Sequence, residues 1–251
     1  MDDAVAALAE QQTELSRLLA SVDGDGWERA SRCAGWTVAD VTLHVAQTNE
    51  MALASVEGRF PEFVAAMAAG LAPASSIDDG AAAMVARERG EPGPAVRARW
   101  QSSADAFLAA VARVDLHQRV TWVAGELSVR TLAATRLAET WIHTGDVAFA
   151  FGAPPTGGDG LRYIARLAWR TLPYAFARAG RPQAGPVAFR LRAPDGDRWD
   201  FVPDTEPVTT ITGDALDLCL VAAQRANASD TGLRGEGPDA AAVLELVRTY
   251  A

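Results

Sequence analysis

The sequence predicts a mainly helical α+β protein, in which a helical domain over residues 1–182 precedes a small α+β domain over residues 183–251. Three observations support this prediction. The chain has 251 residues, which is enough for one large domain or two smaller ones. Apolar residues recur at helical spacing through most of the first part. Alternation with a period of two residues begins only after Pro182.

The first two helices have clear signals. Leu, Val and Ala recur at helical spacing over 3–21. A second helix begins after Thr37, a good N-cap residue, because Asp40 follows three positions later as in a capping box. We expect this helix to run to about Gly58.

Caps and breaking residues place the later helices. Pro94 fits the first turn of a third long helix. Ser128 can cap a fourth long helix over 129–151, and Gly180 ends another that begins near residue 159. Between these helices we expect a short helix at 60–71, loops at 72–80 and 90–93, and a connection at 120–125.

Strand signals appear only near the C-terminal end. Alternating residues over 187–192 lead into Asp195-Gly196, a hairpin turn signal, and a second strand resumes at Trp199. We expect a third short strand at 209–212 and two helices, at 213–225 and 238–250.

Composition excludes several classes of function. The net charge of −9 disfavours binding to nucleic acid or to an anionic membrane surface. The chain has no Lys, so it cannot form a Schiff base through a lysine side chain. It also has no apolar run of about 18 residues and no signal peptide, so we expect a cytoplasmic protein.

Two helices carry a candidate metal site. His44 lies on the stripe that the second helix should bury, and Glu139 and His143 are four residues apart on the fourth long helix. A buried Glu or His is costly unless it is paired, and a divalent metal would pair them. Two His and one Glu leave a coordination position open, as in catalytic zinc sites. The alternative is a buried Glu–His hydrogen bond with His44 as a core residue.

These residues lie in two motifs that resemble one known family. Gly35-Trp-Thr-Val-Ala-Asp-Val-Thr-Leu-His44 resembles the second-helix motif of the DinB-like, mycothiol-dependent maleylpyruvate isomerase family. Arg136-Leu-Ala-Glu139-Thr-Trp-Ile-His143-Thr-Gly-Asp146-Val-Ala is similar to that family's fourth-helix motif. The segment from Gly213 to Arg225 resembles a helix of its small C-terminal domain. The resemblance covers nearly the whole chain.

The resemblance implies a DinB-like four-helix bundle that binds one Zn²⁺, or another divalent metal, through His44, Glu139 and His143. It also implies mycothiol as a thiol cofactor, together with a small-molecule substrate. Within the family the chain resembles a metal-binding branch more closely than the isomerases themselves. The fold and the ligands therefore transfer better than the substrate does.

Four further residues are candidates for the site. Asp146, one turn beyond His143, is a catalytic candidate that could accept a hydrogen bond from the ligand or act as a general base, or it could instead pair with Arg136. Arg225 is the residue at which the family resemblance would put a substrate-binding arginine, although it could form a salt bridge instead. Gln47 and Arg136 share helix faces with the ligands and are cofactor-binding candidates.

The two cysteines, Cys33 and Cys219, lie far apart and form no ligand or redox motif. We therefore expect the thiol to come from a cofactor. The first hypothesis is a zinc-dependent isomerase or thiol transferase that acts on a small organic acid or a natural-product intermediate. A metalloenzyme that needs no thiol and a non-catalytic metal- or ligand-binding protein are the alternatives.

Overall fold

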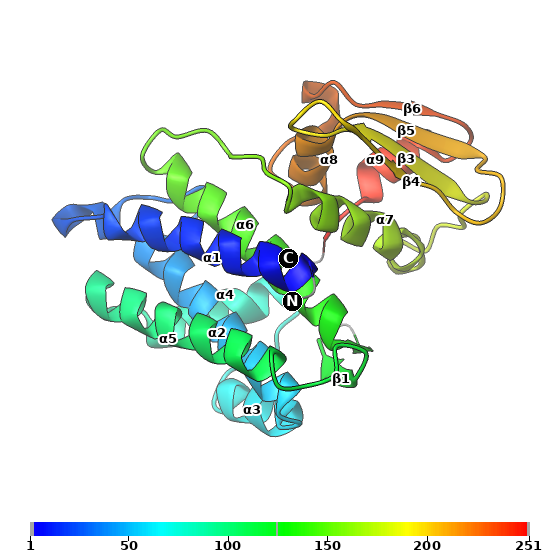
Figure 1. Ribbon diagram of the computed structural model, residues 1–251. Coiled ribbons are helices and arrows are strands. Elements are labelled where there is room, and N and C mark those ends of the chain that lie inside the picture. The colour runs from blue at the N-terminus through cyan, green and yellow to red at the C-terminus, as the bar shows by residue number, and fades with distance from the viewer. Residues whose placement is uncertain (1–2, 124, 250–251) are drawn as a thin grey trace. The chain divides into compact units, whose positions relative to one another are not determined.

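The computed structural model describes residues 3–123 and 125–249, which form two compact units that divide after Pro155 (Figure 1). The first unit is helical apart from one short hairpin, and the second is a small sheet with helices. This is the mainly helical α+β fold that the sequence predicts. The first unit contains α1 (Asp3–Ala20), η1 (Gly24–Glu28), α2 (Val38–Val56), α3 (Phe60–Ala68), α4 (Ile77–Glu88), α5 (Gly93–Val111), β1 (Arg119–Trp122), β2 (Gly125–Ser128) and α6 (Val129–Phe149).

Four long helices, α1, α2, α5 and α6, make up the bundle. Helix α2 packs against α5 and α6, and α1 packs against α6 and α5. The apolar core between them includes Leu15, Val41, Trp100 and Val147, all of which are buried. Helix α6 lies between α1 and α2, so most of its side chains are buried. A polar side chain on α6 must therefore find its partners inside the bundle.

The predicted capping box starts α2. Oγ1 of Thr37 accepts a hydrogen bond from the backbone N–H of Asp40 (3.2 Å), and the Asp40 carboxylate accepts one from the backbone N–H of Thr37 (3.0 Å). These two bonds satisfy N–H groups that a helix N-terminus otherwise leaves unpaired. The two bonds fix the residue at which α2 begins, and so help to fix which of its side chains face α6.

Two segments of the first unit are more regular than the sequence suggested. Helix α4 begins at Ile77, inside the expected loop over 72–80, because Ser76 caps it by accepting a bond from the N–H of Asp79 (3.0 Å). Its apolar periodicity is weak, since Val85 is its one buried residue. The expected connection over 120–125 belongs to a hairpin in which β1 pairs antiparallel with β2.

The second unit contains a four-stranded sheet in the order β4-β3-β5-β6. Strand β3 pairs antiparallel with β4 and parallel with β5, and β5 pairs antiparallel with β6. Helices α7, α8 and α9 contact the strands (Figure 1). The bounds are α7 (Leu161–Arg178), β3 (Val187–Arg192), β4 (Arg198–Phe201), β5 (Thr209–Asp214), α8 (Ala215–Ala222), η2 (Ala228–Asp230), β6 (Arg234–Glu236) and α9 (Ala240–Leu246).

Strand β6 was not expected, and α9 is shorter than the helix predicted over 238–250, whose position 250 lies outside the described residues. The main difference concerns α7, which the sequence analysis grouped with the helical domain and which belongs to the second unit. The indole N–H of Trp169 in α7 donates to the carbonyl oxygen of Val187 in β3 (2.7 Å). An amphipathic helix reveals its apolar face but not the surface which that face covers.

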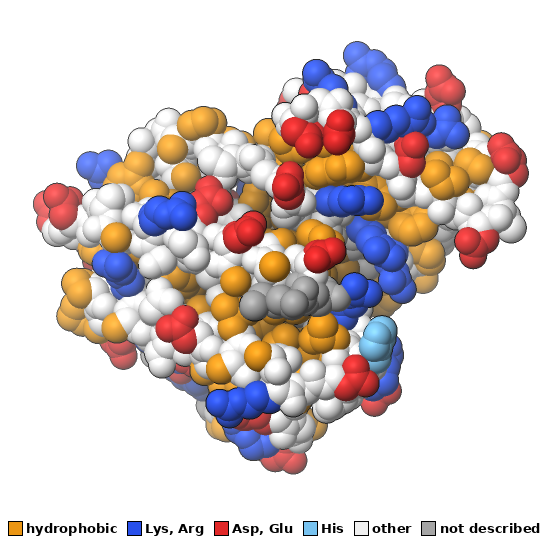
Figure 2. Space-filling view, in the orientation of Figure 1, with side chains coloured by type: hydrophobic (Ala, Val, Ile, Leu, Met, Phe, Trp, Pro, Cys, Tyr) orange, Lys and Arg blue, Asp and Glu red, His pale blue; other side chains and the backbone are white. Residues whose placement is uncertain are grey.

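Acidic and basic side chains are interspersed among apolar ones on the face in Figure 2. No helix among the described residues combines the length and the apolar character needed to cross a bilayer.

The Gly93→Ala variant tests how closely α5 packs against Trp27 in the core of the first unit. A Cβ at Gly93, the first residue of α5, would lie 2.1 Å from Cγ and Cδ2 of Trp27, a core residue that packs in the same cluster as Val41. We expect a loss of about 1–3 kcal/mol in the free energy of unfolding, measured with urea, because the indole must move. Gly80→Ala in α4 is the control, because its Cβ would make only an ordinary contact at 3.5 Å. Equal stability of the two variants would contradict this account.

Candidate metal centre

The three predicted ligands come from two adjacent helices in the interior of the first unit. His44 lies in the second turn of α2, and Glu139 and His143 are one turn apart in the middle of α6. The spacing of four residues puts Glu139 and His143 on one face of α6. Ser128 caps α6 as predicted, by accepting a hydrogen bond from the backbone N–H of Thr131 (3.2 Å).

The ligand atoms of these residues converge. Oε2 of Glu139 lies 3.5 Å from Nε2 of His44 and 3.5 Å from Nε2 of His143. The two imidazole rings meet edge to face, with their centroids 4.9 Å apart. The exposed fractions of His44, Glu139 and His143 are 8%, 7% and 6%. The trio chosen from helix spacing is thus brought together out of contact with most of the solvent.

This donor set fits a divalent cation. Oε2 of Glu139 is buried and has no hydrogen-bond partner among the described residues. Two imidazole nitrogens and one carboxylate oxygen are a common ligand set of catalytic zinc sites. Ligand atoms bound tetrahedrally at about 2.1 Å from zinc lie about 3.4 Å apart, and the two separations here are 3.5 Å. Three such ligands would leave a fourth coordination position open.

Asp146 contacts His143 from the opposite side of the ring. Oδ2 of Asp146 lies 2.9 Å from Nδ1 of His143, and the side chain is completely buried. A carboxylate in this place keeps the proton on Nδ1 and leaves the Nε2 lone pair for a metal. The sequence left open whether Asp146 serves a ligand or pairs with Arg136, and in the structure its carboxylate contacts the candidate ligand His143.

Arg136 is buried one turn before Glu139 in α6. Its Nε donates to Oδ1 of Asn49 (3.2 Å), and its Nη2 donates to Oγ1 of Thr48 (2.9 Å). The Thr48 hydroxyl in turn donates to the backbone carbonyl oxygen of His44 (3.0 Å). Nη1 of Arg136 lies 3.9 Å from Oε2 of Glu139. The guanidinium is therefore held beside the carboxylate by residues of α2.

Charge and burial set the protonation of the trio. Burial lowers the pKa of His44 below its usual value, although Glu139 works in the opposite direction, so the ring is neutral at neutral pH. Burial opposes the ionisation of Glu139, but the rings of His143 and His44 and the Arg136 guanidinium outweigh it and hold the pKa of this carboxyl well below its usual value. Glu139 is therefore ionised.

The pKa of His143 is shifted upward, in contrast to the pKa values of His44 and Glu139. Burial disfavours its charged form, but the interactions with Asp146, Cys33 and Glu139 outweigh burial and raise the pKa of His143 well above the usual value. Without a metal the ring is thus protonated at neutral pH and forms an ion pair with Glu139. A metal bound at Nε2 would have to displace that proton.

Gln47 hydrogen-bonds to α4, and Arg225 belongs to the second unit. The Gln47 amide donates to the carbonyl oxygen of Met84 (3.1 Å) and to the Glu88 carboxylate (3.1 Å), so it joins α2 to α4. Arg225 belongs to the second unit, where it follows α8 and donates to the carbonyl oxygen of Ala223 (3.0 Å).

The interpretation of the cysteines needs a correction. The sequence showed no ligand or redox motif at either cysteine, yet Sγ of Cys33 lies 3.2 Å from Oδ2 of Asp146 and close to the imidazole of His143. Cys33 precedes α2 in a loop, so neither helix spacing nor a short motif could have revealed this contact. Cys219 is buried in the second unit, and burial raises the pKa of its thiol, which makes it unreactive.

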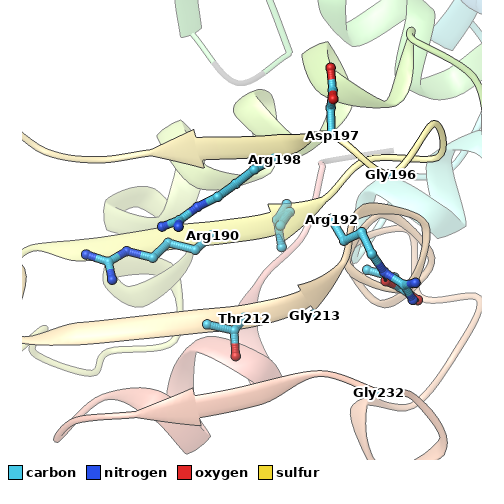
Figure 3. A pocket seen from close by; sticks show the side chains of 10 residues that line it. Arg190, Arg192, Gly196, Asp197, Arg198, Thr212, Gly213 and Gly232 are labelled. Atoms are coloured by element: carbon cyan, nitrogen blue, oxygen red, sulfur yellow. Dashed lines mark hydrogen bonds and ion pairs between the residues drawn. The ribbon is translucent and has the colours of Figure 1, made fainter.

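A groove on the sheet of the second unit is a weaker candidate for a functional site. Arg190, Arg192, Arg198 and Thr212 line it (Figure 3). Arg192 forms two hydrogen bonds of 2.6 Å with the Asp214 carboxylate, and Arg198 pairs with Asp200 (2.8 Å). Much of the positive charge is thus neutralised, and the three arginines are exposed, unlike the buried trio.

Comparison with known sequences points to one family. The sequence model of the mycothiol maleylpyruvate isomerase N-terminal domain matches residues 8–148, more than half of the chain and a range that includes all three candidate ligands. Two proteins from strains of Mycobacterium tuberculosis, uncharacterized proteins MT0041 and Rv0036c, are each 32% identical over 250 residues. These alignments cover 98% of this chain and 95% of each relative.

Solved structures share the fold. A crystal structure of the mycothiol-dependent maleylpyruvate isomerase matches with a TM-score of 0.60 and 21% identity, over 95% of both chains. The crystal structure of a point mutant of that isomerase matches with a TM-score of 0.60 and 20% identity, again over 95% of both chains. Both domains of the fold are thus present in an experimentally determined relative.

Removing a ligand tests the metal site. We expect one Zn²⁺ per chain by elemental analysis of the wild-type protein, and almost none in His44→Ala or Glu139→Ala, because two ligands hold the ion poorly. His117→Ala is the matched control, since His117 is the third histidine and is exposed. A full complement of zinc in either ligand variant would refute the assignment.

The raised pKa of His143 predicts proton release on metal binding. At pH 7 about one proton should leave when Zn²⁺ binds, and affinity should rise about tenfold per pH unit up to the pKa of His143 in the metal-free protein. Titration calorimetry in buffers of different ionisation enthalpy measures the number of protons released. Binding that is independent of pH between 6 and 8 would contradict the protonated state.

Proposed function

The chain belongs to the mycothiol maleylpyruvate isomerase family, and on that basis we propose that it is a zinc-dependent enzyme that uses a low-molecular-weight thiol of the mycothiol type. The reaction class is isomerisation, or thiol transfer, on a small organic acid or a natural-product intermediate. One observation carries the proposal: the ligand atoms of His44, Glu139 and His143 converge in a buried place, and three ligands would leave one coordination position of a zinc ion unfilled.

A zinc ion held by these three side chains would act as a Lewis acid and lower the pKa of a thiol at the open coordination position. The chain's own residues prepare the site for this role. Glu139 is ionised and His44 is neutral, so both can serve as ligands at neutral pH. Asp146 holds the Nδ1 proton of His143 and thereby directs its Nε2 toward Glu139.

Arg136 supports an anionic ligand in this proposal. Asn49 and Thr48 hold its guanidinium in one orientation, so its positive charge needs no rearrangement when a ligand binds. That charge lies 3.9 Å from Oε2 of Glu139, at the edge of the ligand set. A thiolate or a substrate carboxylate close to the metal would be stabilised by it. We therefore retain Arg136 as the cofactor-binding candidate.

The proposed roles of the other candidate residues rest on different kinds of evidence. Asp146 is proposed to orient His143, and its use as a general base is secondary because its Oδ2 already accepts from that ring. Gln47 is proposed to hold α4 on α2 through Met84 and Glu88. Arg225 remains the proposed substrate-binding residue of the second unit on the family resemblance alone.

An activity assay with the thiol omitted tests the proposal. We expect turnover of maleylpyruvate, or of another small acid with an activated double bond, to require both zinc and mycothiol. Lewis-acid stabilisation contributes several kcal/mol, so chelation of the metal should lower the rate by about a hundredfold or more. Turnover is followed by the absorbance change of the conjugated acid.

The outcomes separate the candidate functions. Zinc-dependent turnover without any thiol would replace the proposal with a thiol-independent metalloenzyme. Tight binding of zinc with four protein ligands and no turnover would favour a non-catalytic metal-binding protein. The Glu139→Gln variant serves as the inactive control, because its amide has lost the charge of the ligand but keeps the size of the side chain.

A further inference from the structure

The segment before α2 forms a closed loop that touches both sides of the metal centre. We define the 30–37 loop by its ends, Ala30 and Thr37, which form an isolated antiparallel bridge. Inside it the backbone N–H of Trp36 donates to the carbonyl oxygen of Cys33 (3.0 Å), which closes a tight turn. Gly35 has a φ of +78° in this turn, a value that favours glycine. The loop is therefore a defined structure with little freedom.

One end of the turn is tied to α6 at Asp146. The backbone N–H of Arg32 donates to the carbonyl oxygen of Asp146 (3.2 Å), and the thiol of Cys33 donates to Oδ2 of the same residue (3.2 Å). Oδ2 is also the atom that faces Nδ1 of His143, at 2.9 Å. The thiol and the imidazole thus share one carboxylate oxygen, so the thiol helps to set the position of that oxygen.

The other end of the turn touches the second imidazole. The Trp36 and His44 rings lie with their centroids 5.1 Å apart and their planes inclined by 52°. Nδ1 of His44 is buried and has no hydrogen-bond partner among the described residues, so no hydrogen bond at that nitrogen sets the orientation of the ring. Packing against Trp36 and His143, together with the contact of Nε2 with Glu139, holds the ring.

The thiol itself is not placed to bind the same ion as the trio. Cys33 contacts Asp146, which faces Nδ1 of His143, whereas Glu139 faces Nε2, on the other side of the ring. One imidazole cannot direct both nitrogens at a single ion. Cys33 therefore acts on the metal centre only through its neighbours.

We infer that the 30–37 loop orients both histidine ligands, with Cys33 as a positioning residue that fixes the Asp146 carboxylate and Trp36 as the packing surface for His44. This inference rests on the proposed function, since it concerns ligands of the proposed metal. It assigns a role to a thiol that is neither a nucleophile nor a ligand. Partners of this kind change metal affinity about 10- to 100-fold when they are removed.

The test compares cysteine variants with Zn²⁺ alone as the probe. Cys33→Ala removes the donor and should weaken zinc binding about tenfold, measured by competition with a chelator at constant pH. Cys33→Ser restores a donor and should recover most of that loss. Cys219→Ala makes the same change in the second unit and should leave zinc affinity unchanged. The imidazole ¹⁵N shifts of the zinc-loaded protein should show His143 bound through Nε2 in the wild type and a second, less ordered state in Cys33→Ala.

The experiment can refute the role of the 30–37 loop and still leave the proposed function intact. Wild-type protein with one tightly bound zinc and a Cys33→Ala variant of equal affinity would refute the role of the loop and leave the metal site intact. Equal weakening in the Ser and Ala variants would also refute it, because packing rather than the hydrogen bond would then be responsible. A wild-type protein that binds no zinc would instead refute the metal site itself.

Discussion

Two imidazole rings and an ionised carboxylate have to be accommodated between α2 and α6, away from water, and much of the first unit depends on that constraint. A buried carboxylate is costly unless positive charge and hydrogen bonds surround it. In the metal-free chain, protonated His143 and the guanidinium of Arg136 supply the charge beside Glu139. Asn49 and Thr48, both on α2, are needed because the buried guanidinium itself requires acceptors.

The polar contacts also bind the two helices to each other. Arg136 on α6 reaches Thr48, whose hydroxyl donates to the backbone of His44, so the guanidinium is coupled to a ligand on the opposite helix. Apolar packing alone would allow α2 to slide slightly on α6, which would separate the atoms of the candidate ligands, now 3.5 Å apart. Directional hydrogen bonds oppose such sliding. The capping box at Thr37 adds to this by setting where α2 begins.

Helix periodicity made the convergence of the three candidate ligands predictable, because His44 falls on a buried stripe and Glu139 and His143 share one helical face. It also located the caps at Thr37 and Ser128. It could not reveal Cys33, since the contact of a loop residue with Asp146 depends on how the chain folds back on α6. It missed α4, in which one buried valine gives almost no periodic signal. The grouping of α7 with the sheet likewise depends on contacts such as that of Trp169 with β3, which have no local pattern.

The charge balance of the centre suggests what the open coordination position would accept. In the metal-free chain the formal charges of Glu139, Asp146, Arg136 and protonated His143 cancel. A divalent cation that displaces one proton from His143 would leave one net positive charge in a buried space. Burial strengthens the attraction of that charge for an anion, because little solvent is present to screen it. An anionic ligand, such as a thiolate or a carboxylate, would restore neutrality, whereas a neutral ligand would not. The same residues that balance the charge without a metal would thus favour, with a metal bound, the kind of ligand that thiol-dependent chemistry requires.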